Sequence, residues 1–595
     1  MENKKKEPMG FAKTMWASTL GVVIAFAIIN ILGFFLILGL FVAAVSSGSN
    51  QKVPLAGNNI WVRIDLSGDI PEYQANEVFS YLNGDHATSF DQILTAVANA
   101  ATDSKVDGIL LQGSGSSSLS WAQSDELRDA LAEFKNSGKR LIAYGDAFSQ
   151  PEYFAATTAD LVAVHPSGLV DLKGLGAEVM FYKDLFDKLD VHVELIRPKS
   201  NAYKSAGETY TMNHISEANR EQVRAYMSSI WGHVADGIAQ SRHLSSERVN
   251  QIANSLSGYM AHDALASGIV DSLMFADDVQ KLIKDNYNAK KIVSVERYMQ
   301  SISEKNHNDK IAIIYAEGDV VQGSNQGFQT SVFSDDIVES FNKAADDDNV
   351  KAIVLRVNSP GGDVIASESM THAIIRAKEK KPVVVSMSGL AASAGYEISC
   401  NAHTIVAEPT TITGSIGVFA MVPQIGTMLK NKLGLTTDTV KTNENATGLS
   451  VMRPLSPTAY AMMQNHIEDF YVTFCQRVAT GRNLKREYVE SIAQGRVWTG
   501  LDAKQIGLVD TLGGISLALR IAAEKAGIDN YSTVIYPKEK SFLELLKNSG
   551  SRPDEVVLKL RSKKQNRADR QLFNDLYYLS QATSFQARIP FIVLE

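Results

Sequence analysis

The sequence predicts an α/β protein made of two copies of one domain, preceded by an apolar N-terminal helix. Three observations predict this. Matching segments recur in the two halves of the 595-residue chain at a nearly constant offset. Within each half, short β-rich runs alternate with helical patterns, as in folds with a parallel sheet and crossover helices. Residues 15–45 contain no charged side chain.

The N-terminal segment predicts on which side of a membrane the rest of the chain lies. A helix over residues 15–45 is about 46 Å long at 1.5 Å per residue, which exceeds the roughly 30 Å hydrocarbon core of a bilayer. Lys4, Lys5, Lys6 and Lys13 precede it, and positive charge stays on the cytoplasmic side. We therefore expect a cytoplasmic tail (1–14) and a single-pass anchor (15–45) in the inner, cytoplasmic membrane, with the body on the extracytoplasmic, periplasmic side. The alternative is a cleaved signal peptide, whose apolar region is usually much shorter.

The duplication can be followed by eye. The run Lys105–Gln112 aligns with Asn349–Arg356, Tyr153 aligns with Tyr396, and Asp271 aligns with Asp510. Repeated agreement at a nearly constant offset indicates repeated structure. We predict an N-terminal domain over 55–300, a C-terminal domain over 305–535 and a C-terminal extension over 536–595.

Strands and helices alternate clearly in the second half. The pattern predicts strands over 310–316, 352–357 and 382–387 and a helix over 335–345. A further helix is indicated by the apolar spacing of Met370, Ile374 and Ala377. The strand over 352–357 runs into Asn-Ser-Pro-Gly-Gly, and Ser393 follows the next strand and opens a helix.

Composition excludes several classes of function. A net charge of -8 argues against nucleic acid as a partner, because phosphate binding needs a concentrated basic surface. Two cysteines, Cys400 and Cys475, are too few for a disulfide framework or a cysteine zinc cluster. No metal or cofactor is expected.

The two motifs of the second half together favour acyl transfer. A serine at the start of a helix exposes its hydroxyl and places the next backbone N–H, that of Ala394, beside the reacting carbon. A second N–H, from Gly362 or Gly361, completes an oxyanion hole, in which one donor contributes roughly 3 kcal/mol. The alternative is that Ser393 is only an N-cap.

The sequence offers no clear histidine as the base. His403 is the one histidine near Ser393, and Ala391 stands where the first glycine of a Gly-x-Ser-x-Gly elbow would be. A lysine must then be considered, and it must be neutral to accept a proton, which burial favours. Lys204 has suitable surroundings, with no acidic residue until Glu208. The alternative is that Lys204, like Lys199, is a solvated surface lysine.

Four motifs in order resemble the signal peptide peptidase A family in its long two-domain form. They are Tyr-Lys-Ser-Ala at 203–206, Asn-Ser-Pro-Gly-Gly at 358–362, Ala-Ser-Ala-Gly-Tyr at 392–396 and Thr-Gly-Ser-Ile-Gly at 413–417. The resemblance implies tandem ClpP/crotonase-like domains and a serine endopeptidase with a Ser-Lys dyad. It implies Ser393 as nucleophile, Lys204 as general base, Ser415 as the residue that orients the lysine, and Gly362 and Ala394 as the oxyanion donors.

The resemblance also implies substrates and partners. These are signal-peptide remnants in or at the membrane, and a homo-oligomer, a tetramer with active sites that face inward. Two other classes of function remain open. One is a crotonase-type acyl-CoA hydratase or isomerase, which needs carboxylates at the reacting atoms, and the other is a non-catalytic membrane scaffold.

The two copies differ at the site positions. Gln150 stands at the place of Ser393, Leu172 at that of Ser415, and Gly448 at that of Lys204. The first half keeps only the lysine and the second half keeps the serines. The sequence therefore predicts a site at the boundary of the halves, which neither half forms alone.

Overall fold

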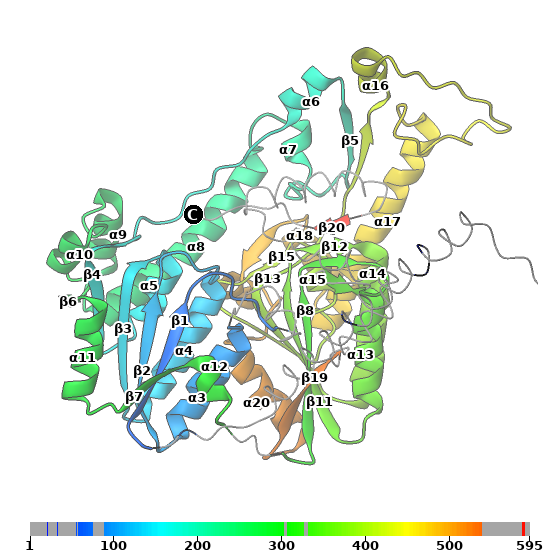
Figure 1. Ribbon diagram of the computed structural model, residues 1–595. Helices are drawn as coiled ribbons and strands as arrows, with labels where there is room; N and C mark the ends of the chain where they lie inside the picture. Colours follow the sequence, from blue (N-terminus) through cyan, green and yellow to red (C-terminus); the bar gives the residue numbers. More distant parts are fainter. Residues whose placement is uncertain are drawn as a thin grey trace, which may run out of the picture.

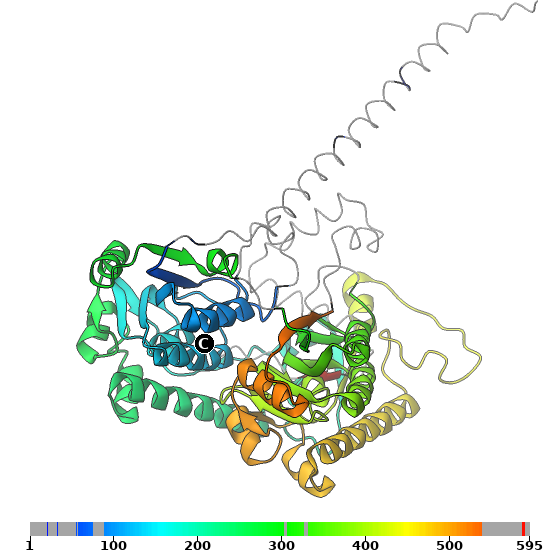
Figure 2. The ribbon, with the colours of Figure 1, turned by 90° about the horizontal axis from the view of Figure 1, so that it is seen from below.

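The computed structural model describes residues 55, 57–74, 88–302, 306–325 and 331–537, the backbone of 586–588, and the isolated residues Thr19, Gly21 and Gly33. Two sheets with their helices lie side by side, the first in blue through cyan to green and the second in green to orange (Figures 1 and 2). Each sheet belongs to one half of the sequence.

The two sheets have the same strand order. The first runs β6 (Ser272–Leu273), β4 (Leu161–Val170), β3 (Arg140–Phe148), β2 (Val106–Gly113), β1 (Ile60–Leu66), β7 (Lys291–Ser294). The second runs β18 (Thr511–Leu512), β14 (Thr404–Ala407), β13 (Val383–Ala392), β11 (Val350–Ser359), β8 (Lys310–Glu317), β19 (Ser532–Tyr536). All these neighbours are parallel. The predicted strands and their parallel arrangement are confirmed.

The second half carries additional strands around the end of β13. β15 (Ile412–Gly414) pairs with β13, and β17 (Val497–Thr499) is antiparallel to β15. A small separate sheet has the order β10 (Ser331–Phe333), β9 (Asp319–Val321), β12 (Gly361–Asp363), β20 (Gln586–Arg588). These additions surround the point where Ser393 leaves β13.

Most of the helices pack on the faces of the two sheets, and the others lie above the sheets (Figure 1). In the first half they are α3 (Phe90–Thr102), α4 (Trp121–Asn136), α5 (Gln150–Ala156), α6 (Lys183–Leu189), α7 (Glu208–Thr211), α8 (Glu217–Arg242), α9 (Ser246–Ser255), α10 (Ala261–Ser267), α11 (Ala276–Asn286) and α12 (Val295–Met299). In the second half they are α13 (Ser334–Asp346), α14 (Val364–Lys380), α15 (Ala394–Glu397), α16 (Gly426–Leu433), α17 (Pro457–Arg482), α18 (Arg486–Ile492), α19 (Gly500–Gln505) and α20 (Ile515–Ala526). α11 and α20 each pack alone on one face, opposite the larger core. Strands buried on both faces explain the near-continuous apolar runs in the sequence.

Matching side-chain contacts support the duplication. The Tyr153 hydroxyl donates to Ile269 O at 2.6 Å, and the Tyr396 hydroxyl donates to Leu508 O at 2.9 Å. At the ends of α8 and α17, Arg242 pairs with Asp271 and Arg482 pairs with Asp510. The aligned residues therefore hold equivalent places in two copies of one fold.

A two-stranded ribbon joins the halves above the sheets (Figure 1). β5 (His192–Ile196) of the first half is antiparallel to β16 (Ala420–Gln424) of the second, and Ile196 pairs with Ala420. Lys204 comes shortly after β5, and Ser415 shortly before β16. The ribbon therefore directs both segments to one place.

A buried ionic cluster also joins the halves. Arg356 on β11 donates to Glu72 at 2.8 Å and to Glu126 on α4 at 2.7 Å, and its third partner is the Ser386 hydroxyl. Burial alone would lower the pKa of Arg356, but the carboxylates of Glu126 and Glu72 raise it above its usual value. The charge of Arg356 is thus balanced from the opposite half.

The described part of the chain contains no helix that is long and apolar enough to cross a membrane. The predicted anchor at 15–45 lies outside the described residues, apart from Thr19, Gly21 and Gly33.

Candidate active site

Ser393 sits at a sharp turn between β13 and α15. Its backbone has φ 58° and ψ -116°, which is rare for a residue with a side chain. Its side chain makes no N-cap hydrogen bond. Its Oγ instead lies 3.3 Å from Gly417 O. The N-cap alternative does not describe this serine, because its hydroxyl points to the segment after β15.

Lys204 reaches this hydroxyl from the other half of the same chain. Its Nζ lies 2.7 Å from Ser393 Oγ, 3.1 Å from Ser415 Oγ and 3.2 Å from Ser415 O. Lys204 is 1% exposed. The structure thus brings together three of the predicted residues, although 189 positions separate Lys204 from Ser393.

Burial controls the charge of the lysine. Removal from water lowers the pKa of Lys204 well below its usual value, and no neighbouring charge offsets this. Its three hydrogen-bond partners are two hydroxyls and a carbonyl, with no carboxylate among them. This environment favours the neutral amine that a proton acceptor requires.

The lysine loop is held by groups from both halves. The Gln222 amide donates to Tyr203 O at 2.9 Å and accepts from Val497 N at 3.2 Å. The Arg496 guanidinium lies over the rings of Tyr203 and Trp498, with its carbon 4.8 Å and 4.6 Å from their centroids. These contacts fix the backbone on which Lys204 stands.

Gly495 permits the close approach of the two halves. It has φ 78°, and a Cβ there would lie 2.5 Å from Lys204 Cβ and 2.7 Å from its backbone N. No sequence pattern singles out Gly495, Arg496 or Gln222, because each matters only through contacts between distant segments. An isolated Gly-Arg pair is too common to be informative.

The predicted oxyanion donors lie on adjacent elements. Gly362 is the centre of β12, and Ala394 is the first residue of α15; both are buried. A Cβ on Gly362 would lie 2.1 Å from Val320 O of β9, so only glycine fits between the strands. A Cβ on Gly395 would lie 2.7 Å from Ser359 O. The start of α15 therefore packs closely against the Asn-Ser-Pro-Gly-Gly loop.

The remaining histidine and lysine candidates lie elsewhere. The His403 ring accepts from Val383 N, where β13 begins. Ser393 follows the opposite end of this ten-residue strand, about 30 Å away at 3.3 Å per residue. Lys199 is exposed, and its backbone N–H donates to Glu468. Of these candidates, only Lys204 contacts Ser393.

The matching place in the first half is filled by its own side chains. The Gln150 amide oxygen accepts from Lys173 N and Gly174 N. Glu152 accepts from the backbone N–H of Gly115 at 2.7 Å and of Ser117 at 3.1 Å. These loop donors correspond to the Pro-Gly-Gly loop of the second half, so an internal carboxylate holds them.

The other two aligned positions are equally unsuited to this chemistry. Leu172 is buried in the core of the first half. Gly448 lies in a turn between α16 and α17 and donates to Asn445 O.

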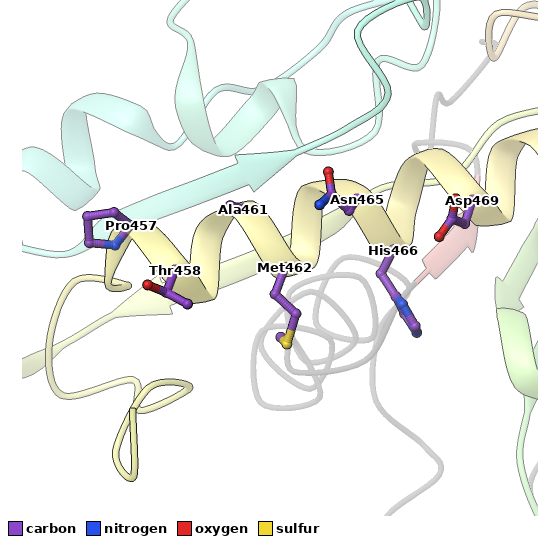
Figure 3. Close-up of a pocket in the computed structure, with 7 residues that line it drawn as sticks. All are labelled: Pro457, Thr458, Ala461, Met462, Asn465, His466 and Asp469. Carbon is purple, nitrogen blue, oxygen red and sulfur yellow. The ribbon is translucent and has the colours of Figure 1, made fainter. Parts of the chain in front are cut away.

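An open groove of about 730 Å³ runs along α17, but it holds none of the predicted site residues (Figure 3). It is lined by Pro457, Thr458, Ala461, Met462, Asn465, His466 and Asp469. All seven come from one side of a single helix, and the His466 ring packs edge-on against Phe470. The candidate active site is therefore the buried contact of Lys204 with Ser393.

The chain is similar to known proteases. The model of peptidase family S49 matches residues 133–290 and 375–529, one region in each half, and the Clp protease model matches 291–409. Protease 4 of Haemophilus influenzae is 32% identical over 83% of this chain and 83% of its own length. Protease 4 of Salmonella typhi is 35% identical over 78% of this chain and 76% of its own.

A plant relative extends the comparison. The chloroplastic serine protease SPPA of Arabidopsis thaliana is 30% identical over 78% of this chain and 69% of its own length. The tandem S49 regions and the Clp protease match agree with two sheets of one ClpP-like α/β fold. The chain belongs to peptidase family S49 and is a serine protease.

Proposed function

We propose that the protein is a membrane-anchored endopeptidase that degrades signal-peptide remnants, with Ser393 and Lys204 as its catalytic dyad. The observation that carries the dyad is the arrangement around Lys204 Nζ. A neutral amine has two N–H groups and one lone pair. With the two N–H groups on Ser415 Oγ and Ser415 O, the lone pair faces the third neighbour, the hydroxyl of Ser393.

The proposed mechanism follows from these contacts. Lys204 takes the Ser393 proton as Oγ attacks the peptide carbonyl, and the resulting oxyanion accepts from the N–H groups of Gly362 and Ala394. The ammonium then gives its proton to the leaving amine, which departs and leaves an acyl-enzyme. Water, deprotonated by the same amine, attacks the ester, and Ser393 recovers its proton as the acid is released.

The contacts around Lys204 Nζ also suit the ammonium that forms in the first step. Its three N–H groups match the three acceptors around Nζ, namely the oxygen of Ser393 and the two oxygens of Ser415. Ser415 is therefore proposed to orient the amine in both protonation states. Neither alternative class uses this arrangement: a hydratase needs carboxylates at the reacting atoms, and a scaffold needs no buried lysine.

The proposal extends to location and assembly. The apolar segment 15–45 is the proposed single-pass anchor in the inner membrane, which places the domains 55–300 and 305–535 on the extracytoplasmic side. A homotetramer with active sites that face inward is proposed from the family resemblance. In such an assembly, small apolar remnants at the membrane would reach the active site, whereas other proteins would be kept away from it.

The test is labelling of the purified full-length protein in detergent with a fluorophosphonate. We expect labelling of the wild type and its loss in Ser393→Ala. Ser340→Ala is a matched control, because Ser340 is also a buried serine but its hydroxyl donates to Asp336 O within α13. Lys204→Ala should abolish peptide hydrolysis. Full labelling of Ser393→Ala, or an unchanged rate in Lys204→Ala, would contradict the dyad.

A further inference from the structure

The strand that carries Gly362 has a second partner from the far end of the chain. β12 pairs on one edge with β9, where Gly362 faces Val320. On its other edge it is antiparallel to β20, with Gly361 opposite Arg588, Gly362 opposite Ala587 and Asp363 opposite Gln586. Figure 1 shows β20 in red beside β12. More than 200 residues separate the two strands.

This edge of β12 adjoins the proposed reaction centre. Gly362 is a proposed oxyanion donor, and the loop before β12 packs on the first turn of α15, directly after Ser393. A peptide whose carbonyl receives an N–H from Gly362 must run along β12. Extended peptides often bind by adding a strand to an open sheet edge, where main-chain hydrogen bonds provide affinity.

Only one edge of β12 is open to such a peptide. The β9 edge is closed, because the backbone of Val320 lies where a Cβ of Gly362 would be. An added strand must therefore lie on the opposite edge, and that is the place of β20. The residue of β20 opposite Gly362 is Ala587, a small residue of the kind found beside the cleavage sites of signal peptides.

We propose that β20 occupies the place of the peptide substrate, so that the segment around Gln586–Arg588 competes with substrates for β12. The proposal rests on the proposed function, since it takes β12 as the strand beside the oxyanion. It specifies the bound form of the substrate as an extended chain antiparallel to β12, with a small residue opposite Gly362.

The competition is tested with Ala587→Pro in the full-length chain. Proline at position 587 removes the backbone N–H and restricts φ to about -65°, which does not match an antiparallel strand, so β20 should leave β12. With a fluorogenic peptide substrate we expect KM to fall at least threefold while kcat stays within twofold. Ala582→Pro, five residues earlier and outside β20, is the matched control and should leave both constants unchanged.

A synthetic peptide of residues 583–591 supplies the converse measurement. Added to Ala587→Pro protein, it should raise KM toward the wild-type value without a change in kcat, and its own Ala587→Pro form should inhibit at least fivefold more weakly. An unchanged KM in Ala587→Pro, or a loss of kcat that marks β20 as part of the working site, would overturn the proposal. Either result would leave Ser393 labelling intact, so it is distinct from failure of the dyad.

Discussion

At the scale of single residues, the charge of Lys204 links activity to stability. Burial lowers the folded-state pKa of Lys204, whereas the unfolded value is about 10.4. Between the two values the unfolded state binds more protons, so this group makes stability increase with pH across that window. At pH values below this window both states bind the proton, and the folded protein carries the full free-energy cost of a buried ammonium.

Replacement of the lysine should therefore stabilise the protein. We expect Lys204→Met to raise the free energy of unfolding by about 0.5–2 kcal/mol at neutral pH, a usual gain when an active-site group is relieved. The gain should shrink as pH rises toward 10. Urea unfolding at several pH values measures this, with Lys343→Met, at an exposed position on α13, as control. A Lys204→Met protein that is less stable at neutral pH would show that the amine is not neutralised by burial.

Ser415 should act on both the rate and its pH dependence. Its hydroxyl is one of three acceptors around Nζ, so Ser415→Ala removes an interaction that favours the ammonium and should lower the pKa of Lys204 further. We expect kcat to fall about 10- to 100-fold through poorer orientation, and the pH at which the rate rises to move to lower values. The measurement is the pH profile of kcat.

The control for Ser415 lies on the preceding strand. Thr413→Val removes a buried hydroxyl that donates to Ala391 O and does not contact Lys204. It should leave the position of the pH profile unchanged. If both variants lower kcat equally and neither moves the profile, Ser415 has only a structural role.

At the scale of elements, the turn before β17 lies against the loop that carries Lys204. This contact sets the geometry of the proposed dyad. Gly495→Ala places a methyl group against Lys204 Cβ and should lower kcat about 100-fold, as displacements near 1 Å do. Gly507→Ala is a matched control, because its φ of 80° is almost the same as the 78° of Gly495 but its Cβ would meet nothing closer than 3.5 Å. Both should lose about 1 kcal/mol of stability. Equal activity in the two variants would contradict this account.

The elements that the sequence predicts well are those with a local pattern. The strand over 352–357 and the helix over 335–345 are present as β11 and α13, because buried parallel strands and amphipathic helices have clear periodicity. The ribbon of β5 with β16 and the pairing of β20 with β12 had no such signal. Each depends on a partner more than 200 residues away, and the strands are only three to five residues long.

The residues of the candidate site also divide into those that the sequence predicts and those that it does not. Ser393 and Gly362 stand out by their position after strands, and the contact of Lys204 with Ser393 could be expected from the duplication together with the family resemblance. The supports of the lysine loop, Gln222 and Arg496, could not. Their roles come from packing between the halves, which residue type and spacing do not encode.

At the scale of the whole molecule, the proposed dyad makes the first half a supporting copy and the second half a reacting copy. The first half fills its own oxyanion loop with Glu152 and contributes Lys204 across the boundary. Activity therefore depends on how firmly the halves are joined. A fully buried charge at that boundary is Arg356, which contacts Glu72 and Glu126 of the first half.

Loss of Arg356 should weaken the join in a pH-dependent way. In Arg356→Met the two carboxylates stay buried without a cation, and we expect a loss of about 3–5 kcal/mol at pH 8. Burial already raises the pKa of Glu126, and without the opposing effect of Arg356 this folded-state value rises further above the unfolded one. The folded variant then takes up protons as pH falls, so its loss of stability should be smaller at pH 5.

Lys351→Met is the control on the same strand. Lys351 forms an exposed ion pair with Asp309 at 3.6 Å, and such a pair contributes about 0–1 kcal/mol. Urea unfolding at both pH values, with peptide hydrolysis in parallel, would contradict this if Arg356→Met lost the same stability at pH 5 as at pH 8.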